Sequence, residues 1–465
     1  MNIPESTKAE YFDNAIEKQL VINFPDLGLT VDMEHIVYES MTLKESIFDG
    51  SSIEFVGCIS SEFSVGLYGV SQNLKGQRII ASIKTEDTDP IRLFYGIVDS
   101  VEMEANHNKR KITAYDLLYT AGNLELAKWY KKLKFPISLL NFRNSLFNEI
   151  DSQVYAKYGI HFTQESVSLP NDWVQIKKRY NPSTLRSIDV IKSLCQINGV
   201  FGIVNRQGIF EYRSLSNTID IEGAFPGSTG EVLYPPFNPG VVPIPGGITP
   251  TQSIPYYRGF DYQEFVVKPV EMVTIRQDEE DDGRSYGYGA NNYIIQGNMF
   301  TYKLSKSDLD RIALNVYLNV QGVAYQPVDS ENDGLPWVEC GVDNVSYYAY
   351  DYEQEDFVTK KYYVFSRTLS GIQVLKDNYT ADGEQDQRQF ITDIGAQIDL
   401  IKKKQTDVDL SNYYDKDYID DNYYDKDYID GLDPGGGWSV ESVSKLPSNP
   451  QMEVLYLIQG EVVVH

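Results

Sequence analysis

The chain of 465 residues is long enough for about three domains of ~150 residues, each with its own hydrophobic core. Its formal net charge of −26 at pH 7 disfavours binding to the phosphates of nucleic acid or to an anionic membrane surface, because both need clustered Lys and Arg. The simplest role of such an acidic surface is solubility.

The three cysteines, Cys58, Cys195 and Cys340, are odd in number and too widely spaced for a Cys-x-x-Cys pair. We therefore expect buried free thiols, formed in a reducing compartment, and no disulfide framework. The N-terminal segment lacks the apolar stretch of a secretory signal, and no apolar run approaches the ~20 residues of a membrane span.

Alternating apolar residues dominate residues 1–125. Successive side chains of a strand point to opposite faces, so the alternation in residues 91–103, broken only at Asp99, predicts a long strand with one face in a core. The turn residues 106–108 interrupt the pattern and residues 111–115 resume it, which predicts a long antiparallel hairpin. Shorter alternating runs around Phe55 and Val65 are separated by turn residues, which predicts a β-barrel or sandwich. The apolar positions of the hairpin's first strand are Ile91, Leu93, Tyr95, Ile97, Val101 and Met103.

Residues 126–220 change to an α+β pattern. One helix is indicated by apolar residues at helical spacing, and a second helix is expected to start at a Ser183 or Thr184 cap and to end at Asn198-Gly199. A short hairpin follows in residues 200–213. The apolar faces are Leu139, Phe142, Leu146 and Ile150 in the first helix, and Leu185, Ile188, Ile191, Leu194 and Cys195 in the second.

Residues 221–255 are rich in Pro and Gly, a composition that predicts an extended loop or linker. Residues 256–385 return to strand patterns and are predicted to form a second barrel, interrupted by a helix at residues 306–320. A long hairpin within it is predicted by the aromatic residues on both sides of Lys360-Lys361, which are Tyr347, Tyr348, Tyr350 and Tyr352 before the pair and Tyr362, Tyr363 and Phe365 after it.

Residues 386–410 have the spacing of a coiled-coil seam. Isoleucine at both core positions favours trimers or tetramers, so we expect self-association here, with an amphipathic helix packed on its own barrel as the alternative. The predicted seam residues are Ile391, Ile394, Ile398, Ile401, Gln405 and Val408.

A nine-residue sequence, NYYDKDYID, occurs twice in residues 411–432, and residues 433–465 contain a Gly-rich hinge and a final hairpin. The repeat is interpreted as a neck between chains, although a disordered spacer has the same composition. The predicted neck contacts are Tyr413, Tyr414, Tyr418, Tyr423, Tyr424 and Tyr428.

No catalytic, cofactor-binding or metal-binding residues are predicted. The four histidines stand apart from one another and from the cysteines, and no zinc, phosphate-loop or nucleophile-elbow motif occurs. Residues 329–334 begin like a calcium loop, but Cys340 occupies the position of the bidentate Glu, so a surface turn is expected instead.

Several stretches of the sequence resemble phage tail hub proteins. These are the baseplate hubs of contractile tails and the N-terminal part of tail-associated lysins of long-tailed phages. LFYGIVDSVE, KITAYDLLY and YESMTLKESIFDGSSIEFVGCISSEFSV are similar to the first barrel of a hub, and NGVFGIVNRQGIFEYRSL is similar to its middle domain. YYDKDYID resembles the necks of tail fibres and spikes, and residues 443–464 resemble a small fibre appendage.

The resemblance implies a mainly β protein, in which two β-barrel domains flank an α+β domain and a short coiled coil and small β appendage follow. It implies a homotrimeric hub at the virion tail tip, assembled in the bacterial host cytoplasm, with a central channel for DNA. Its expected partners are the distal tail or tail tube protein and a receptor-binding, fibre or spike protein, with the tape measure protein as a further candidate. No specific nucleic acid is expected as a partner. A tail-associated cell-wall hydrolase and a glycan-binding adhesin are the alternatives.

Overall fold

The structure is a computed structural model that divides into two compact units, Met1–Leu400 and Ile401–His465. It describes residues 3–13, 15–47, 57–103, 108–178, 181–214, 219–220, 257–263, 265–278, 281–321, 323–341, 343–351, 356–383, 389–391, 439–443, 454–458 and 461–464. The fold is mainly β, with one large antiparallel sheet and six α-helices among the described residues.

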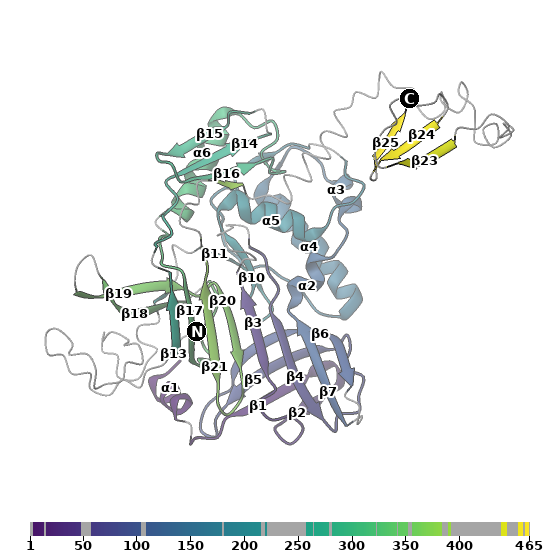
Figure 1. Ribbon diagram of the computed structural model, residues 1–465. Coiled ribbons are helices and arrows are strands. Elements are labelled where there is room, and N and C mark those ends of the chain that lie inside the picture. Colours follow the sequence, from purple (N-terminus) through teal and green to yellow (C-terminus); the bar gives the residue numbers. More distant parts are fainter. Residues whose placement is uncertain are drawn as a thin grey trace, which may run out of the picture. The chain divides into compact units, whose positions relative to one another are not determined.

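The large sheet of the first unit contains 11 strands in the order β13-β17-β21-β20-β3-β4-β7-β6-β5-β1-β2, and every neighbouring pair is antiparallel (Figure 1). The first strand-rich region of the chain contributes β1 Gln19–Phe24, β2 Leu29–Val31, β3 Thr42–Ser46, β4 Glu62–Tyr68, β5 Arg78–Lys84, β6 Ile91–Met103 and β7 Lys109–Tyr115. The second contributes β13 Tyr257–Tyr262, β17 Val328–Asp333, β20 Ser366–Ser370 and β21 Lys376–Ala381.

The two strand-rich regions meet where β3 pairs with β20, more than 300 residues away in the sequence. The expectation of two separate closed barrels is not met in the described residues, because the ladder ends at β2 and β13 and runs through both regions. A single bridge between Ile36 and Leu67 brings the segment after β2 back to β4, so the first region curls on itself without closing. Pairing β3 with β20 satisfies backbone groups that would otherwise form a sheet edge.

The long hairpin is confirmed as β6 paired with β7, and it explains the anomaly at Asp99. The register shifts between Val98 and Ser100, so Asp99 is the extra residue of a β-bulge and is exposed. A bulge reverses which face the following side chains occupy. Val98, Val101 and Met103 therefore share the face of the buried Ile112 and Ala114, and Met103 is 54% exposed as the last residue of β6.

Helices cover one end of the first region and form the α+β insert. They are α2 Leu117–Gly122, α3 Ala127–Lys132, α4 Leu139–Tyr158 and α5 Ser187–Asn198; α1 Glu5–Phe12 and the 3₁₀ helix η1 Pro25–Leu27 lie earlier in the chain. Two small sheets accompany them, β8 Ile137–Ser138 with β9 Gln175–Ile176, and β10 Phe201–Val204 with β11 Phe210–Arg213. The four apolar residues predicted for the first helix are all buried in α4, which confirms that helix.

Helix α5 begins later than the predicted Ser183 or Thr184 cap, because the chain before it is held extended. The Leu185 amide donates to a Glu125 carboxylate oxygen at 2.6 Å, and the Leu185 carbonyl accepts from the Leu126 amide at 2.7 Å. Leu185 is therefore buried outside the helix, whose N-cap is Arg186. Its C-terminal end is as predicted, with Gly199 in the left-handed region at φ 64°.

The predicted helix at residues 306–320 is confirmed as α6 Lys306–Val320, which opens with a capping box between Ser305 and Asp308. It packs on a four-stranded sheet of order β15-β14-β16-β22 and on α5, so this part lies outside the large sheet. The strands are β14 Met272–Arg276, β15 Arg284–Gly287, β16 Asn292–Gln296 and β22 Gln389–Ile391.

The tyrosine-rich hairpin is confirmed as β18 Asp343–Asp351 paired with β19 Asp356–Tyr363. Its assignment to a second barrel is wrong, since β18 pairs on its other side with β12 Ile219–Asp220 in a separate three-stranded sheet. The second unit contains another three-stranded sheet, of β23 Ser439–Val443, β24 Val454–Ile458 and β25 Glu461–Val464. Strands β24 and β25 form the predicted final hairpin.

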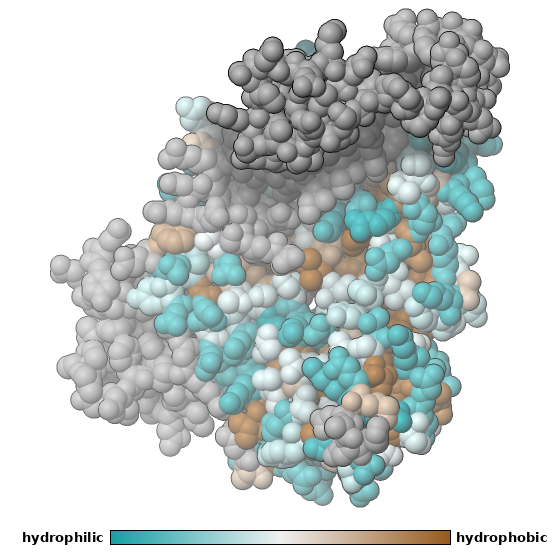
Figure 2. All heavy atoms as spheres, turned by 45° about the vertical axis from the view of Figure 1, so that its right-hand side comes forward, coloured by the Kyte–Doolittle hydropathy of each residue, from teal (hydrophilic) through white to brown (hydrophobic). Residues whose placement is uncertain are grey.

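Hydrophilic residues cover much of the described surface in Figure 2, and the hydrophobic residues between them form small separate groups. None of the helices in the described part of the chain has the length and hydropathy needed to cross a membrane.

Candidate functional site

The junction between the two strand-rich regions holds the strongest concentration of buried charge in the described residues. Four side chains meet there, which we name the junction cluster: Glu45 of β3, Arg206 of the turn between β10 and β11, Arg367 of β20 and Asp377 of β21. Arg367 and Asp377 are fully buried, and the side chains of Arg206 and Glu45 are 4% and 13% exposed. The cluster joins the first region, the α+β insert and the second region.

Strand register places three of these side chains on one face. Arg367 lies directly opposite Glu45 across β3 and β20, and directly opposite Tyr379 across β20 and β21. Asp377 is two residues before Tyr379, so it lies diagonal to Arg367 on the same face. In β20 and β21 the buried and exposed positions alternate, and the charged pair falls in the buried set.

Arg367 makes a bidentate ion pair with Asp377. Its Nε atom donates to Asp377 Oδ1 at 2.9 Å, and its Nη2 atom donates to Asp377 Oδ2 at 2.7 Å. The guanidinium also donates to the carbonyls of Leu335 and Val338, and its Nη1 atom lies 3.4 Å from Glu45 Oε2. Burial alone would lower the pKa of Arg367, but the negative charge of Asp377 raises it above its ordinary value.

Arg206 brings the insert into the same network. Its Nη2 atom donates to the Val338 carbonyl at 2.6 Å and lies 3.5 Å from Glu45 Oε2, and its Nη1 atom donates to the Pro336 carbonyl. Asn205 fixes this turn, because its side-chain oxygen accepts from the amides of Gln207 and Ile209. One short segment of the second region is thus held by two arginines from different parts of the chain.

The junction cluster is suited to holding the regions together. Arginine stays protonated at physiological pH, so neither guanidinium offers a proton for acid–base chemistry. A pocket beside the cluster, lined in part by Glu45, Arg206, Glu339 and Cys340, has a volume of about 20 Å³. That is room for about one water molecule, which is too little for a metabolite.

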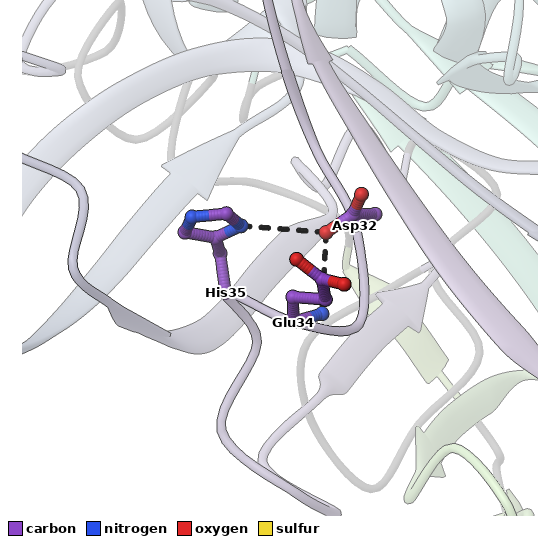
Figure 3. Close-up of side chains that lie close together, drawn as sticks. All are labelled: Asp32, Glu34 and His35. Atoms are coloured by element: carbon purple, nitrogen blue, oxygen red, sulfur yellow. Dashed lines mark hydrogen bonds and ion pairs between the residues drawn. The ribbon is translucent and has the colours of Figure 1, made fainter.

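The sequence suggested that His35 and His161 stand alone, but in the structure each lies beside an aspartate. His35 Nδ1 lies 3.3 Å from Asp32 Oδ1, with Glu34 beside it (Figure 3), and His161 Nδ1 lies 3.1 Å from Asp151. The i,i+3 spacing of Asp32 and His35 could have signalled the first pair. The His35 hydrogen bond lowers the pKa of Asp32, but Asp32, Glu34 and His35 are all exposed.

None of the three cysteines contacts a histidine in the described residues. Cys58 and Cys195 lie against each other, and Cys340 donates to the Glu45 carbonyl. All three are free and buried, as expected.

The candidate calcium loop is a strand, so the expected surface turn is wrong. Residues 329–333 belong to β17, which pairs with β13 on one side and β21 on the other. Ser330 and Asn332 point inward and hydrogen-bond to each other at 2.9 Å. Alternating small polar residues suit a strand whose inner polar groups satisfy one another.

The predicted seam and neck fall almost wholly outside the described residues. Ile391 is the exception, and it lies in β22, parallel to β16, where a helix was expected. Its β-branched side chain and the neighbouring Phe390 favour a strand where a free sheet edge is available. The seam residues Ile394, Ile398, Ile401, Gln405 and Val408 and the six neck tyrosines lie outside the described residues.

The junction cluster was not predicted from the sequence, although a signal for it was present. Arg367 and Asp377 each occupy an apolar position of an alternating strand pattern, where a charge is costly unless it is paired. The other two members, Glu45 and Arg206, could not be inferred, because they come from distant parts of the chain.

No protein-family model matches the sequence, and no curated protein matches it. Three solved structures have partial structural similarity to this chain. A tail protein from Neisseria meningitidis MC58 has 10% identity and a TM-score of 0.45, covering 80% of this chain and 100% of its own. The 43 kDa tail protein of prophage MuSo2 from Shewanella oneidensis has 10% identity and a TM-score of 0.47, covering 79% and 98%. Prophage tail protein gp18 from Listeria monocytogenes EGD-e has 9% identity and a TM-score of 0.44, covering 83% and 99%.

Proposed function

We propose that the chain is a structural protein of a phage tail, a homotrimeric hub that adapts the sixfold tail tube to a threefold tail tip. The observation that carries the proposal is the β3–β20 pairing, with the junction cluster beneath it. The pairing makes two distant strand-rich regions one continuous sheet, so each subunit offers two β modules in a fixed relation. Three subunits around one axis then supply six modules to meet a sixfold tube.

The C-terminal residues would define which end of the subunit faces away from the tail tube. The seam residues from Ile394 to Val408 would hold three chains together, and the tyrosine repeat in residues 411–432 would extend the threefold axis away from the tube. The small sheet of the second unit would then attach to a receptor-binding, fibre or spike protein. The distal tail or tail tube protein, with the tape measure protein, would meet the opposite end.

The acidic balance of the chain supports a channel role. A net charge of −26 repels phosphates, so a channel with acidic walls would let DNA pass without binding it. Buried thiols without a disulfide suit assembly in the host cytoplasm. The chemistry of the described site is that of an assembly component, and no catalytic role is assigned.

Negative-stain electron microscopy of the purified full chain tests the proposal. We expect ring-shaped particles with threefold symmetry, six peripheral densities and a central channel. Gold-labelled antibodies against the chain should bind only the tail tip of tailed particles. Solitary particles without a channel, or labelling along the tail shaft, would contradict the hub function.

The enzyme alternative has its own test. Addition of the purified chain to a suspension of bacterial cell walls should leave the turbidity unchanged. Rapid clearing would establish a cell-wall hydrolase and contradict a purely structural role of the protein.

A further inference from the structure

Two of the three cysteines are in contact inside the first unit. The Sγ atoms of Cys58 and Cys195 are 3.8 Å apart, and the residues are 5% and 0% exposed. The sulfurs of a disulfide are about 2.05 Å apart, so a closing movement of roughly 2 Å would join them. Cys340 has no cysteine beside it in the described part of the chain, and its thiol donates to the Glu45 carbonyl at 3.5 Å.

Backbone hydrogen bonds hold the segment that carries Cys58 against the α+β insert. The Gly202 amide donates to the Gly57 carbonyl at 2.9 Å, and the Ser61 amide donates to Asp116 Oδ2 at 2.7 Å. A Cβ atom at Gly202 would lie 2.8 Å from the Cys58 sulfur, so the glycine leaves the space that this thiol occupies. Cys195 is fixed in the last turn of α5, where its carbonyl accepts from the Val200 amide at 3.1 Å. Ordered backbone on both sides therefore sets the distance between the thiols.

We propose that Cys58 and Cys195 form a reversible disulfide when the protein meets a small-molecule disulfide. Cys58 reacts first, because it is the less buried of the two and adjoins the partly exposed residues 59–61. Its sulfur loses a proton and attacks the small disulfide, whose S–S bond breaks and releases one thiol. Burial raises the pKa of Cys195, which makes it the poorer first nucleophile. Its sulfur then loses a proton, attacks the Cys58 sulfur and releases the second small thiol.

The reaction needs no oxidant other than the small disulfide. Two protein thiols are oxidised to one disulfide, and the small disulfide is reduced to two thiols. The new bond joins residues 137 positions apart and ties the segment between β3 and β4 to α5. The stage at which the bond closes rests on the proposed function, because a tail protein leaves a reducing cytoplasm for an oxidising exterior.

Oxidised glutathione is the probe for the test, applied to the folded full-length chain. After treatment the chain is unfolded, its remaining thiols are alkylated, and its intact mass and peptides are measured. We expect the alkylated thiols to fall from three to one, with the loss of two hydrogen atoms from the mass and a peptide linking Cys58 to Cys195. Dithiothreitol should restore all three thiols.

Variants separate this pair from the third cysteine. Cys340→Ser keeps a hydroxyl donor at that position and should form the link as fully as the natural chain. Cys58→Ser and Cys195→Ser should each lose it, so two independent variants report the same bond. Three thiols after treatment, a stable glutathione adduct at Cys58, or a link to Cys340 would each overturn the proposal. Because the mass is measured on unfolded chains, the result is independent of whether the protein is a trimer.

Discussion

Replacing Arg367 with Met tests whether the junction cluster holds the two strand-rich regions together. The variant keeps an aliphatic side chain but leaves the fully buried Asp377 carboxylate without its bidentate partner. Among the described residues, the donors left to the Asp377 carboxylate would be the Leu335 amide and the Tyr379 hydroxyl. Removing one partner of a buried pair costs about 3–5 kcal/mol, a large part of the ~5–15 kcal/mol by which native domains are stable.

Urea denaturation, followed by circular dichroism and by fluorescence, measures this cost as the change in the free energy of unfolding. The matched control is Arg186→Met, which removes an ion pair with Asp189 whose side chains are 56% and 31% exposed. We expect the control to cost about 0–1 kcal/mol.

A double variant separates the ion pair from other effects. Asp377→Asn keeps an oxygen acceptor without charge, so combining it with Arg367→Met leaves no unpaired charge between them. We expect the double variant to be more stable than the sum of the single losses by about 0.5–3 kcal/mol. If Arg367→Met costs no more than the Arg186→Met control, the junction cluster is not what stabilises the contact of the two regions.

Two further predictions concern pH and assembly. Burial raises the pKa of Asp116 from 3.8 to about 7, so the folded chain binds a proton in this interval that the unfolded chain does not. The contribution of Asp116 to stability is therefore greatest below pH ~4 and is lost as pH rises through about 7. Relative to Asp116→Asn, which still caps α2, the natural chain should lose stability between pH 5 and pH 8, as measured by urea denaturation. A stability difference that stays constant or changes in the opposite direction would show that the carboxylate is ionised. Ile394→Asp with Ile398→Asp should weaken the trimer in sedimentation experiments while circular dichroism shows both strand-rich regions folded, and an unchanged mass would show that the seam does not join the subunits.

Local sequence patterns predicted much of the secondary structure. The β6–β7 hairpin, α4, α6 and the final hairpin of the chain follow from alternation, helical spacing and caps within a few residues. The break at Asp99 was visible in the sequence, but a bulge and a single misplaced charge give the same pattern. The partner strand, through its register, distinguishes them.

The arrangement of the strands could not be predicted in the same way. The pairing of β3 with β20 depends on matching edges far apart in the chain, which no local pattern encodes. The same holds for the junction cluster, since Asp377 lies near Arg367 in the sequence but Glu45 lies 322 residues away. The start of α5 was missed for a similar reason, as Glu125 holds Leu185 extended.

The mass of the full-length chain in solution tests the trimeric hub most directly. Sedimentation velocity or native mass spectrometry, at micromolar concentration and physiological salt, should give about three times the 52.9 kDa of one chain. A strict monomer under those conditions would contradict the hub function, because six β modules around one axis need three chains.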